Sequence, residues 1–421
     1  MTTTTDTTYA DRAAELLTLP EPWADMARWH EQMGEIRRAM PVVRVESEGF
    51  LPFLAVLRYA DVNAIERDSE LWHNTTYSVL QPEEAKQLLI DSGLPEPQTL
   101  VHLDGVKHRD HRQVANDWFK PGSVKKRQPR IDDLADQYIE RMRELGGECD
   151  FAKDVAQPFT LRVIMEIFGV PETDEALMLE LTQGMFGAGD PEFMGDLSDP
   201  GAVVLNSVAK FITYFNEITE DRRARPTDDL ATVIATGMPG GCPMGDAERL
   251  WYYMIIATAG HDTTSYALSG GLEALLHDPE QLWELRGNPD LAANAAEEAV
   301  RWTTPVRHFM RYATCDTEVA GVPVATGDRV LLCYPSANRD ESVFDDPDRF
   351  DIHRGNADRL LAFGGGTHYC LGSQFARREV RTMLGKLAER LEHIELAGPA
   401  EWTQSNFVSG VKHLPISYRF A

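Results

Sequence analysis

The sequence predicts a mainly α-helical protein with small β-sheets. Apolar residues recur at helical spacing through most of the region from His108 to Trp302, and again from Leu371 to Leu391. Short extended runs bounded by glycine lie before and after that region, which is typical of small peripheral sheets. No linker rich in proline, glycine or serine divides the 421 residues, so we expect one large domain over residues 21–421.

Each element follows from its local pattern. Residues 1–20 begin with a threonine-rich run and predict a flexible tail. Next come a helix over 21–40, a hairpin of Val42–Val45 with Phe53–Leu57 and a short helix over 61–67. The segment 75–99 is expected to be mostly loop, with room for one helical piece. Further helices are expected near 106–119, 129–145, 156–168, 172–186, 202–224, 246–277, 278–287 and 290–302. Strands follow over 317–330, then an irregular stretch over 338–363, a helix over Leu371–Leu391 and a terminal strand.

Composition excludes several kinds of partner. Lys and Arg number 41 against 67 Asp and Glu, a formal charge of −26, which argues against nucleic acid and anionic membranes. Five dispersed cysteines without a CxxC pair indicate a reducing compartment, and the first residues lack the features of a signal peptide. The longest apolar stretch carries His261 and Asp262, so it predicts a buried helix rather than a membrane span. We therefore expect a cytoplasmic protein.

The most informative segment is the loop Phe363–Gly372, which reads FGGGTHYCLG. Consecutive glycines suit a backbone that turns sharply against a flat, bulky group. Cys370 stands at the start of a helix, where free backbone N–H groups favour a thiolate over a thiol. From these residues alone, a glycine-rich turn with an incidental buried cysteine remains the alternative.

A second segment, Ala259–Thr264, lies in the middle of the apolar helix and reads AGHDTT. Thr263 follows Ala259 by four residues, so its hydroxyl can reach that carbonyl and open the helix. Asp262 in so apolar a setting is costly unless paired, and an acid beside an alcohol near a kink suits a proton relay. A kinked helix whose aspartate forms a structural ion pair is the alternative.

The spacing of these residues resembles the cytochrome P-450 family. Phe363, Gly366, His368, Cys370 and Gly372 match its haem-binding loop, and residues 259–264 resemble its oxygen-binding helix. The resemblance implies the cytochrome P-450 fold, with haem b between that helix and the one after the cysteine loop. Cys370 then binds the iron, and a haem thiolate favours O–O cleavage.

The resemblance also assigns roles to single residues. Asp262 delivers protons, Thr263 stabilises the activated dioxygen, and His261 points away from the haem without a catalytic role. Phe363 packs near the thiolate and His368 binds a haem propionate. The remaining residues expected to contact the haem are His108, Arg112, Ala259, Gly260, Arg311, Gly364 and Gly372.

Another motif has a structural role by resemblance. Glu298-Ala-Val-Arg301 resembles the family's Glu-x-x-Arg, and Arg349 in Pro347–Phe350 matches the third member of that triad. The network is expected to fix the core behind the cysteine loop.

The substrate pocket is expected to be apolar. Its side chains should come from the 75–99 loop and from Met185, Phe186, Ile255, Ile256, Val306, Phe309, Phe407 and Val408. This indicates a small hydrophobic substrate, such as a monoterpenoid or an alkyl or cyclic hydrocarbon. The similarity is strongest to the bacterial terpineol-oxidising members, carried by residues 147–151, 169–172, 181–183, 334–341 and 406–410.

The activity implied is that of a monooxygenase that uses dioxygen and electrons from another protein. The chain has neither a GxGxxG loop after a strand nor a four-cysteine cluster, so the reductase is separate. By resemblance it is a ferredoxin with its ferredoxin reductase. Candidate docking residues are Lys107, Arg109, Arg112, Lys125, Lys126, Arg377 and Arg378. A peroxide-driven peroxygenase and a non-enzymatic haem sensor remain alternatives.

Overall fold

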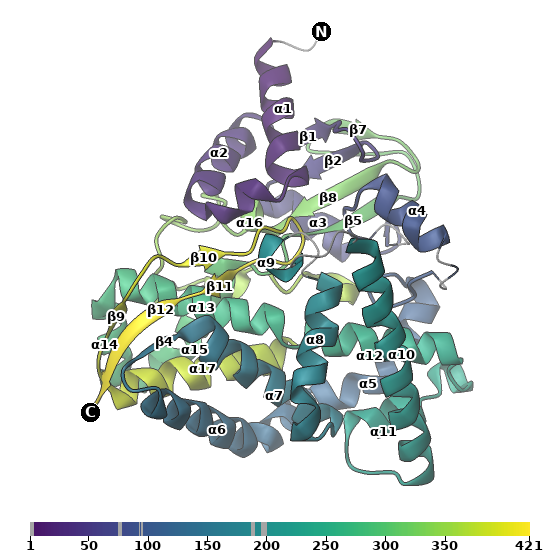
Figure 1. Cartoon of the computed structure of the whole chain (residues 1–421). Helices are drawn as coiled ribbons and strands as arrows, with labels where there is room; N and C mark the ends of the chain where they lie inside the picture. The colour runs from purple at the N-terminus through teal and green to yellow at the C-terminus, as the bar shows by residue number, and fades with distance from the viewer. Residues whose placement is uncertain (1–3, 75–77, 92, 94–95, 187–189, 195–199) are drawn as a thin grey trace.

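A helical layer and a smaller sheet-containing layer make up the molecule (Figure 1). The computed structural model describes residues 4–74, 78–91, 93, 96–186, 190–194 and 200–421. Within these residues the mainly helical class with small sheets is confirmed. No helix in the described ranges is both long and apolar enough to cross a membrane.

The sheet layer is built around five strands in the order β1-β2-β8-β5-β3. These strands are β1 (Val42–Val45), β2 (Phe53–Val56), β3 (Trp72–His73), β5 (His308–Ala313) and β8 (Arg329–Cys333). The predicted hairpin is confirmed, with Val45 opposite Phe53, while β2 and β8 run parallel. Chain segments almost 300 residues apart therefore share one sheet. Strand β5 connects this sheet to the helical layer, because it follows directly after the helix Ala292–Thr303.

The prediction of a flexible tail was wrong for most of residues 1–20. Thr4–Thr18 forms helix α1, which stands beside α2 (Met26–Ala39) and next to the sheet (Figure 1). Ala13, Leu16 and Leu17 are buried because their helical spacing places them on one face, against a cluster that includes Trp29. The threonine-rich composition concealed this apolar face.

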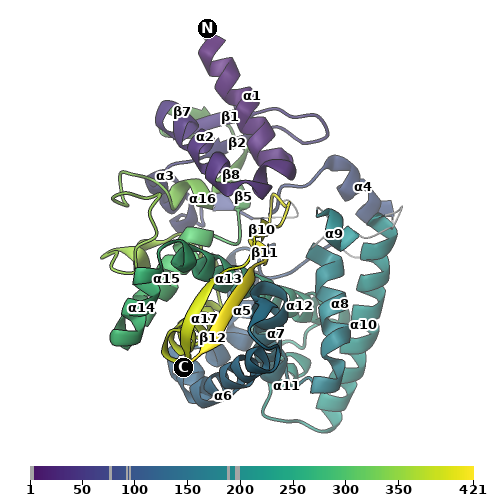
Figure 2. The same ribbon diagram turned by 60° about the vertical axis from the view of Figure 1, so that its left-hand side comes forward.

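The helical layer holds most of the chain. Its long helices are α5 (Gly105–Phe119), α6 (Pro121–Glu144), α7 (Gln157–Phe168), α8 (Glu175–Phe186), α10 (Pro200–Ala224), α12 (Asp246–Ala259), α13 (Asp262–His277), α15 (Ala292–Thr303) and α17 (Ser373–Arg390). Shorter helices are α3 (Tyr59–Arg67), α4 (Glu83–Asp91), α9 (Pro191–Met194), α11 (Leu230–Ala235), α14 (Pro279–Gly287) and α16 (Tyr334–Ala337). In both views α8 and α10 stand side by side (Figure 2).

Three small sheets complete the fold of the described residues. They pair β4 (Glu148–Asp150), β12 (Pro415–Phe420) and β9 (Leu391–Leu396); β6 (Thr317–Val319) with β7 (Val322–Val324); and β10 (Glu401–Trp402) with β11 (Val411–His413). β9 and β12 run along the helical layer to the C-terminus (Figure 2). All five cysteines are free thiols.

The helix predicted over 21–40 begins with a separate 3-10 turn over Glu21–Ala24, and two further predicted helices also differ from the structure. The helix expected over 246–277 is divided into α12 and α13, because residues 260 and 261 leave the regular helical path. Helix α6 begins at Pro121 and continues through Pro129, where a helix start was expected. Proline fits best in the first turn of a helix, so Pro121 and Pro129 each predict a helix start. In the structure only Pro121 is one.

The functional helices lie in the centre of the main core. Helix α13 packs against α7, α15 and α17. Gly271 allows the approach of α15, because a Cβ there would lie 2.5 Å from the Cβ of Ala299. Leu268, Leu272 and Leu384 are among the fully buried side chains between these helices. This close packing fixes α13 relative to α17. It therefore also positions residues 259–264, at the start of α13, relative to the cysteine loop that precedes α17.

Candidate active site

One cavity of about 610 Å³ brings the predicted haem-site residues together. It is bounded by the cysteine loop, the break between α12 and α13, the start of α5 and strand β5. The predicted residues in its wall are His108, Arg112, Ala259, Gly260, Asp262, Thr263, Arg311, Phe363, Gly364, His368, Cys370 and Gly372. Segments separated by more than 250 residues thus meet at one site, as the resemblance implied.

The glycines of the cysteine loop have a steric reason. Gly366 has φ +57°, and a Cβ there would lie 2.2 Å from the carbonyl oxygen of Glu66. Gly364 also has a positive φ of +67°. The backbone N–H of Cys370 donates to the carbonyl of Phe363 at 2.8 Å, which closes the loop on itself. The loop therefore packs tightly against α3 while it turns Cys370 toward the cavity.

The surroundings of Cys370 act on its thiol in two directions. Burial raises the pKa of the Cys370 thiol, while backbone N–H groups of Gly372 and Ser373 and the guanidinium groups of Arg112 and Arg377 lower it. Burial is the larger effect, whereas the helix start acts in the predicted direction, because its backbone N–H groups favour the thiolate. The sulfur faces the lumen of the cavity, where it is accessible although protein surrounds the site.

The residues in this cavity fit a haem. A Cβ at Gly372 would meet no atom within 4 Å, so the space above the first turn of α17 is open. The Nε2 of buried His108 has no hydrogen-bond partner among the described residues, and the guanidinium groups of Arg112 and Arg311 face the same space. A soft sulfur ligand beside cationic donors suits an iron porphyrin with two carboxylates.

The donors at the carboxylate end of the site are held by one another. Arg112 donates to the carbonyl of Tyr369 at 2.6 Å, and the ring centroids of His108 and His368 lie 4.1 Å apart. Burial, followed by His368, lowers the pKa of His108 to about 4, and burial also lowers the pKa of His368. Both histidines are therefore neutral at pH 7, and the arginines provide the positive charge.

Two residues of this cluster were not predicted from the sequence. Glu66 of α3 accepts from Arg311 at 3.0 Å and from the hydroxyl of Tyr334. The side-chain amide of Asn74 lies 2.6 Å from the Nε2 of His368. Neither belongs to a recognisable motif, because their partners lie more than 240 residues further along the chain.

The break between α12 and α13 confirms the predicted opening of the helix. The hydroxyl of Thr263 donates to the carbonyl of Ala259 at 3.1 Å. Gly260 is required sterically, because a Cβ there would lie 2.7 Å from Cγ1 of Ile164 on α7. Asp262 begins α13, lines the cavity and is only 7% exposed. Its carboxylate lies 3.0 Å from Nδ1 of His261.

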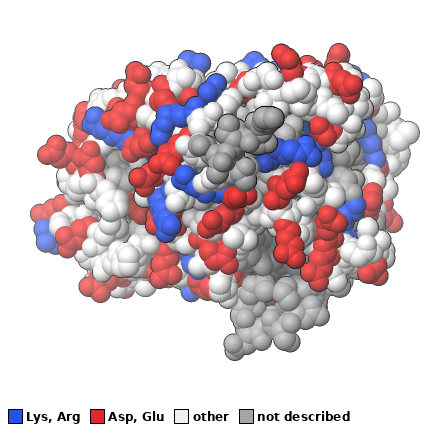
Figure 3. Space-filling model, turned by 90° about the horizontal axis from the view of Figure 1, so that it is seen from above, with Lys and Arg blue, Asp and Glu red and all other residues white. Residues whose placement is uncertain are grey.

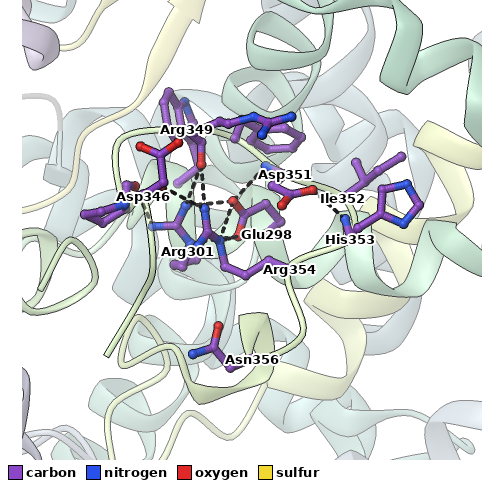
Figure 4. A network of polar contacts seen from close by, with 12 residues as sticks. Glu298, Arg301, Asp346, Arg349, Asp351, Ile352, His353, Arg354 and Asn356 are labelled. Carbon is purple, nitrogen blue, oxygen red and sulfur yellow. Dashed lines mark hydrogen bonds and ion pairs between the residues drawn. The ribbon is translucent and has the colours of Figure 1, made fainter. Parts of the chain in front are cut away.

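Two members of the expected triad are in contact, and a different arginine stands where the third was expected. Arg301 donates to both carboxylate oxygens of Glu298, each at 2.7 Å. The second guanidinium on Glu298 belongs to Arg354, at 3.1 Å, and not to Arg349 (Figure 4). The side chain of Arg349 is exposed, and only its carbonyl takes part, accepting from Arg301 and Arg354. The irregular turn between residues 349 and 354 directs the later arginine inward.

Most of the predicted substrate-pocket residues line the same cavity. Ile255, Ile256, Val306, Phe309, Phe407 and Val408 are all in its wall. The side chains of Met185 and Phe186 lie outside the part of the chain that is described. Of the 75–99 loop, residues 79, 81, 86, 90, 96, 97 and 99 line the cavity. Ile164, Ile167 and Met254 add to the apolar wall and were not predicted.

A buried histidine joins two of these wall segments. Nε2 of His308 accepts from the backbone N–H of Leu80 at 2.9 Å, and its Nδ1 lies 2.9 Å from the carbonyl of Asn406. The backbone N–H of Leu80 can only donate, so Nε2 must be the accepting nitrogen. The ring hydrogen is therefore on Nδ1, which donates to Asn406. Burial lowers the pKa of His308 to about 4, which keeps the ring neutral. The loops that carry Val79 and Phe407 are thereby fixed to β5.

Comparisons with known proteins agree with this site. Residues 283–418 match the family described as Cytochrome P450. Among curated proteins, Cytochrome P450-terp from Pseudomonas sp is 38% identical, covering 98% of both chains. Steroid C26-monooxygenase from Mycolicibacterium smegmatis is 34% identical over 82% of this chain and 86% of that protein. Linalool 8-monooxygenase from Pseudomonas putida is 32% identical over 92% and 95%.

A solved structure shows the same fold. The crystal structure of CYP108D1 from Novosphingobium aromaticivorans is 37% identical and superposes with a TM-score of 0.89, covering 97% of this chain and 99% of that chain. Fold, cavity and whole-length similarity define a haem-thiolate oxidoreductase. The chain belongs to the cytochrome P450 family and is a P450 monooxygenase.

Proposed function

We propose that this P450 inserts one atom of dioxygen into a C–H bond of a small hydrophobic substrate, a monoterpenoid or an alkyl or cyclic hydrocarbon, with electrons from a ferredoxin. One observation carries the proposal. Cys370, the Asp262–Thr263 pair and a largely apolar wall share one cavity. An apolar wall binds substrate by excluding water and leaves few polar groups to orient it.

The wall favours a compact substrate. The ring centroids of Phe309 and Phe407 lie 5.7 Å apart, and the backbones of Val306 and Val408 form an isolated bridge. Together with His308, these contacts make that side of the cavity rigid. The names of Cytochrome P450-terp and Linalool 8-monooxygenase support a terpenoid, whereas that of Steroid C26-monooxygenase points to a larger substrate.

The residues divide the work of the reaction. When bound, a haem thiolate supplies dioxygen activation and O–O cleavage. Cys370 would bind the haem iron, and Arg112, Arg311, His108 and His368 would hold the haem propionates. Thr263 already donates its hydroxyl hydrogen to Ala259, so its oxygen presents lone pairs to the cavity. The proton must therefore come from an acid, and of the acids in the wall Asp262 is the one next to Thr263 in the chain; the others are Glu66, Glu96 and Glu379.

Electrons enter from a separate protein on the side of the cysteine loop. Of the docking candidates, Arg377 is already paired with Glu297 at 2.5 Å and Arg378 with Gln128 at 2.7 Å. Lys125 and Lys126 at the start of α6 are exposed, and Arg109 is 73% exposed. Elsewhere, on the face seen in Figure 3, acidic side chains are widespread and basic ones are scattered among them. A ferredoxin is thus expected to use a small local patch.

The first test is the difference spectrum of the dithionite-reduced protein with and without carbon monoxide. A strongly red-shifted Soret band is expected, and Cys370→Ala should abolish it. A band typical of histidine-ligated haem in the wild-type protein would overturn the role of Cys370. Compounds from both size classes are then ranked by the spin-state shift they produce, and a preference for steroids would overturn the compact-substrate proposal.

The electron source is tested by turnover. Product formed with NADH, ferredoxin and reductase is compared with product formed with peroxide alone. Coupled turnover in the first mixture is expected, and Lys125→Glu with Lys126→Glu should slow reduction mainly at low ionic strength. Turnover with peroxide alone would indicate a peroxygenase, and no turnover with either would indicate a haem sensor.

A further inference from the structure

The two arginines in the wall of the cavity, Arg112 and Arg311, have unlike surroundings. Arg112 donates to the carbonyl of Tyr369 and takes part in no ion pair with the described residues. Arg311 lies 3.0 Å from the carboxylate of Glu66, and these two side chains are only 4% and 1% exposed. The protein itself therefore neutralises the charge of Arg311, whereas it leaves that of Arg112 without a carboxylate.

The carboxylate of Glu66 has two donors. Its Oε2 accepts from Arg311, and its Oε1 accepts from the hydroxyl of Tyr334. Burial, followed by the charge of Glu66, raises the pKa of Tyr334 well above its usual range, so this hydroxyl keeps its hydrogen and donates it. Burial alone would lower the pKa of Arg311, but the charge of Glu66 outweighs burial and raises that pKa. A carboxylate that accepts from a guanidinium and a hydroxyl is stabilised as the anion.

Glu66 is fixed against the cysteine loop. It lies near the end of α3, where a Cβ added at Gly365 would lie 3.0 Å from its own Cβ. A Cβ added at Gly364 would lie 3.7 Å from its Oε1. Glu66 and Arg311 both line the cavity that contains Cys370. The negative charge of Glu66 is therefore held at the edge of the haem site, where burial keeps solvent from screening it.

A buried charge at this place acts on the haem iron. A nearby anion opposes the addition of an electron to the iron and a nearby cation favours it, and both effects are strong where the dielectric constant is low. A propionate held by Arg311 meets a guanidinium whose charge Glu66 has already cancelled. The negative charge of that propionate then stays uncompensated, so the iron is harder to reduce.

We propose that Glu66 lowers the reduction potential of the haem iron by neutralising Arg311. Glu66 is a positioning residue, because it acts through the guanidinium that it orients. The driving force for the first electron from the ferredoxin is thereby set in part by an acid that belongs to no recognisable motif. The inference rests on the proposed binding of a haem propionate by Arg311.

The test is the midpoint potential of the haem iron, measured on the purified holoprotein by spectroelectrochemistry. Glu66→Gln keeps the size of the side chain and an oxygen that accepts from Arg311, so only the charge is lost. The potential should shift to a higher value, while the Soret band of the carbon monoxide complex stays in place because Cys370 is unchanged. Asp104→Asn is the matched control, since Asp104 is 17% exposed and its ion-pair contact among the described residues is with His368, at 3.5 Å. An unchanged potential in Glu66→Gln, or a shift no larger than that of Asp104→Asn, would overturn the proposal.

Two further variants separate this inference from the role of Arg311. Arg311→Gln should lower the potential, and the double variant with Glu66→Gln should return it close to the wild-type value. The double variant removes both charges and leaves no buried ion unpaired, so its comparison with Arg311→Gln gives the effect of Glu66 even if Glu66→Gln alone does not fold.

The rate of haem transfer to an apoglobin is the second readout. Arg311→Gln should speed haem loss several-fold, whereas Glu66→Gln should slow it several-fold, because the guanidinium then keeps its whole charge for the propionate. A purely structural Glu66 would instead release haem faster when changed. If Arg311→Gln altered neither potential nor haem loss, the role of Arg311 would be wrong. An effect of Arg311→Gln without one of Glu66→Gln would overturn only the role of Glu66.

Discussion

Two carboxylates of the core, Glu298 and Asp262, differ in how completely they are bonded. Glu298 is 0% exposed and accepts from Arg301, Arg354 and the backbone N–H of Asp351. Asp262 is nearly as buried and lines the cavity, but its one ion-pair contact among the described residues is a ring nitrogen of His261. The two groups are chemically alike, and only their surroundings differ.

The difference explains why one acid is structural and the other can be functional. A carboxylate that accepts from two guanidinium groups stays an anion, because protonation would cost several charge-assisted hydrogen bonds. A carboxylate that accepts no such set of hydrogen bonds does not lose them when it binds a proton. Glu298, with its full set of hydrogen bonds, lies behind the cysteine loop, where rigidity is required. Asp262 lies in the cavity wall.

Removing the carboxylate of Glu298 should have the largest effect on stability. Glu298→Gln leaves Arg301 and Arg354 buried without their carboxylate, which should cost about 3–5 kcal/mol of unfolding free energy. Urea unfolding measures it. Arg354→Ala should also be strongly destabilising, while Arg349→Ala should change stability by less than about 0.5 kcal/mol, because that side chain is exposed. A larger loss for Arg349→Ala than for Arg354→Ala would reverse our correction of the triad.

Changing Asp262 should affect the rate of product formation rather than the stability of the fold. Asp262→Asn keeps the shape of the side chain but cannot donate the proton, so product formation should fall by about 10²–10⁴-fold. Unfolding free energy should change little, because Asp262 takes part in few contacts. The measurements are product per NADH consumed and urea unfolding on the same preparations. A variant that lost stability but kept its coupling would show that Asp262 is structural, like Glu298.

The same contrast explains what could be predicted from the sequence. Cys370 with its glycines and Thr263 with Ala259 act over a few residues, so their spacing carries their geometry. Arg354 was missed because two arginines five residues apart compete for Glu298, and an irregular turn decides between them. Glu66 reaches Arg311 across 245 residues, and Thr182 reaches His261 across 79, with no local signal. Partners brought together only by folding leave no pattern in a single sequence.

Gly260, in the break between α12 and α13, tests how far the position of Asp262 depends on close packing. In Gly260→Ala the new Cβ would lie 2.7 Å from Ile164, on a helix that is itself buried, so either α7 or the break must move. The expected cost is about 1–3 kcal/mol of unfolding free energy, together with partial uncoupling because Asp262 is displaced. Gly287→Ala is the control, since its Cβ would meet nothing within 4 Å. If both variants were equally stable, the break would not depend on close packing.

The smallest effect is expected where a histidine meets carboxylates near the surface. His413 of β11 contacts Asp150 through Nδ1 and Glu192 through Nε2, the latter at 2.9 Å. These carboxylates outweigh burial and raise the pKa of His413 above its usual 6.5. The folded protein therefore holds the proton more tightly than the unfolded chain. The resulting stabilisation is complete below pH 6.5 and is lost as the pH rises through the folded pKa.

His413→Gln should accordingly cost less than about 1 kcal/mol, because solvent screens the pair, and the loss should be greater at pH 6 than at pH 9. Urea unfolding at both values measures it. His393→Gln is the control, because its ion pair with Glu395, at 3.5 Å, is exposed and should contribute almost nothing. A loss for His413→Gln that did not depend on pH would mean that the ring acts by packing.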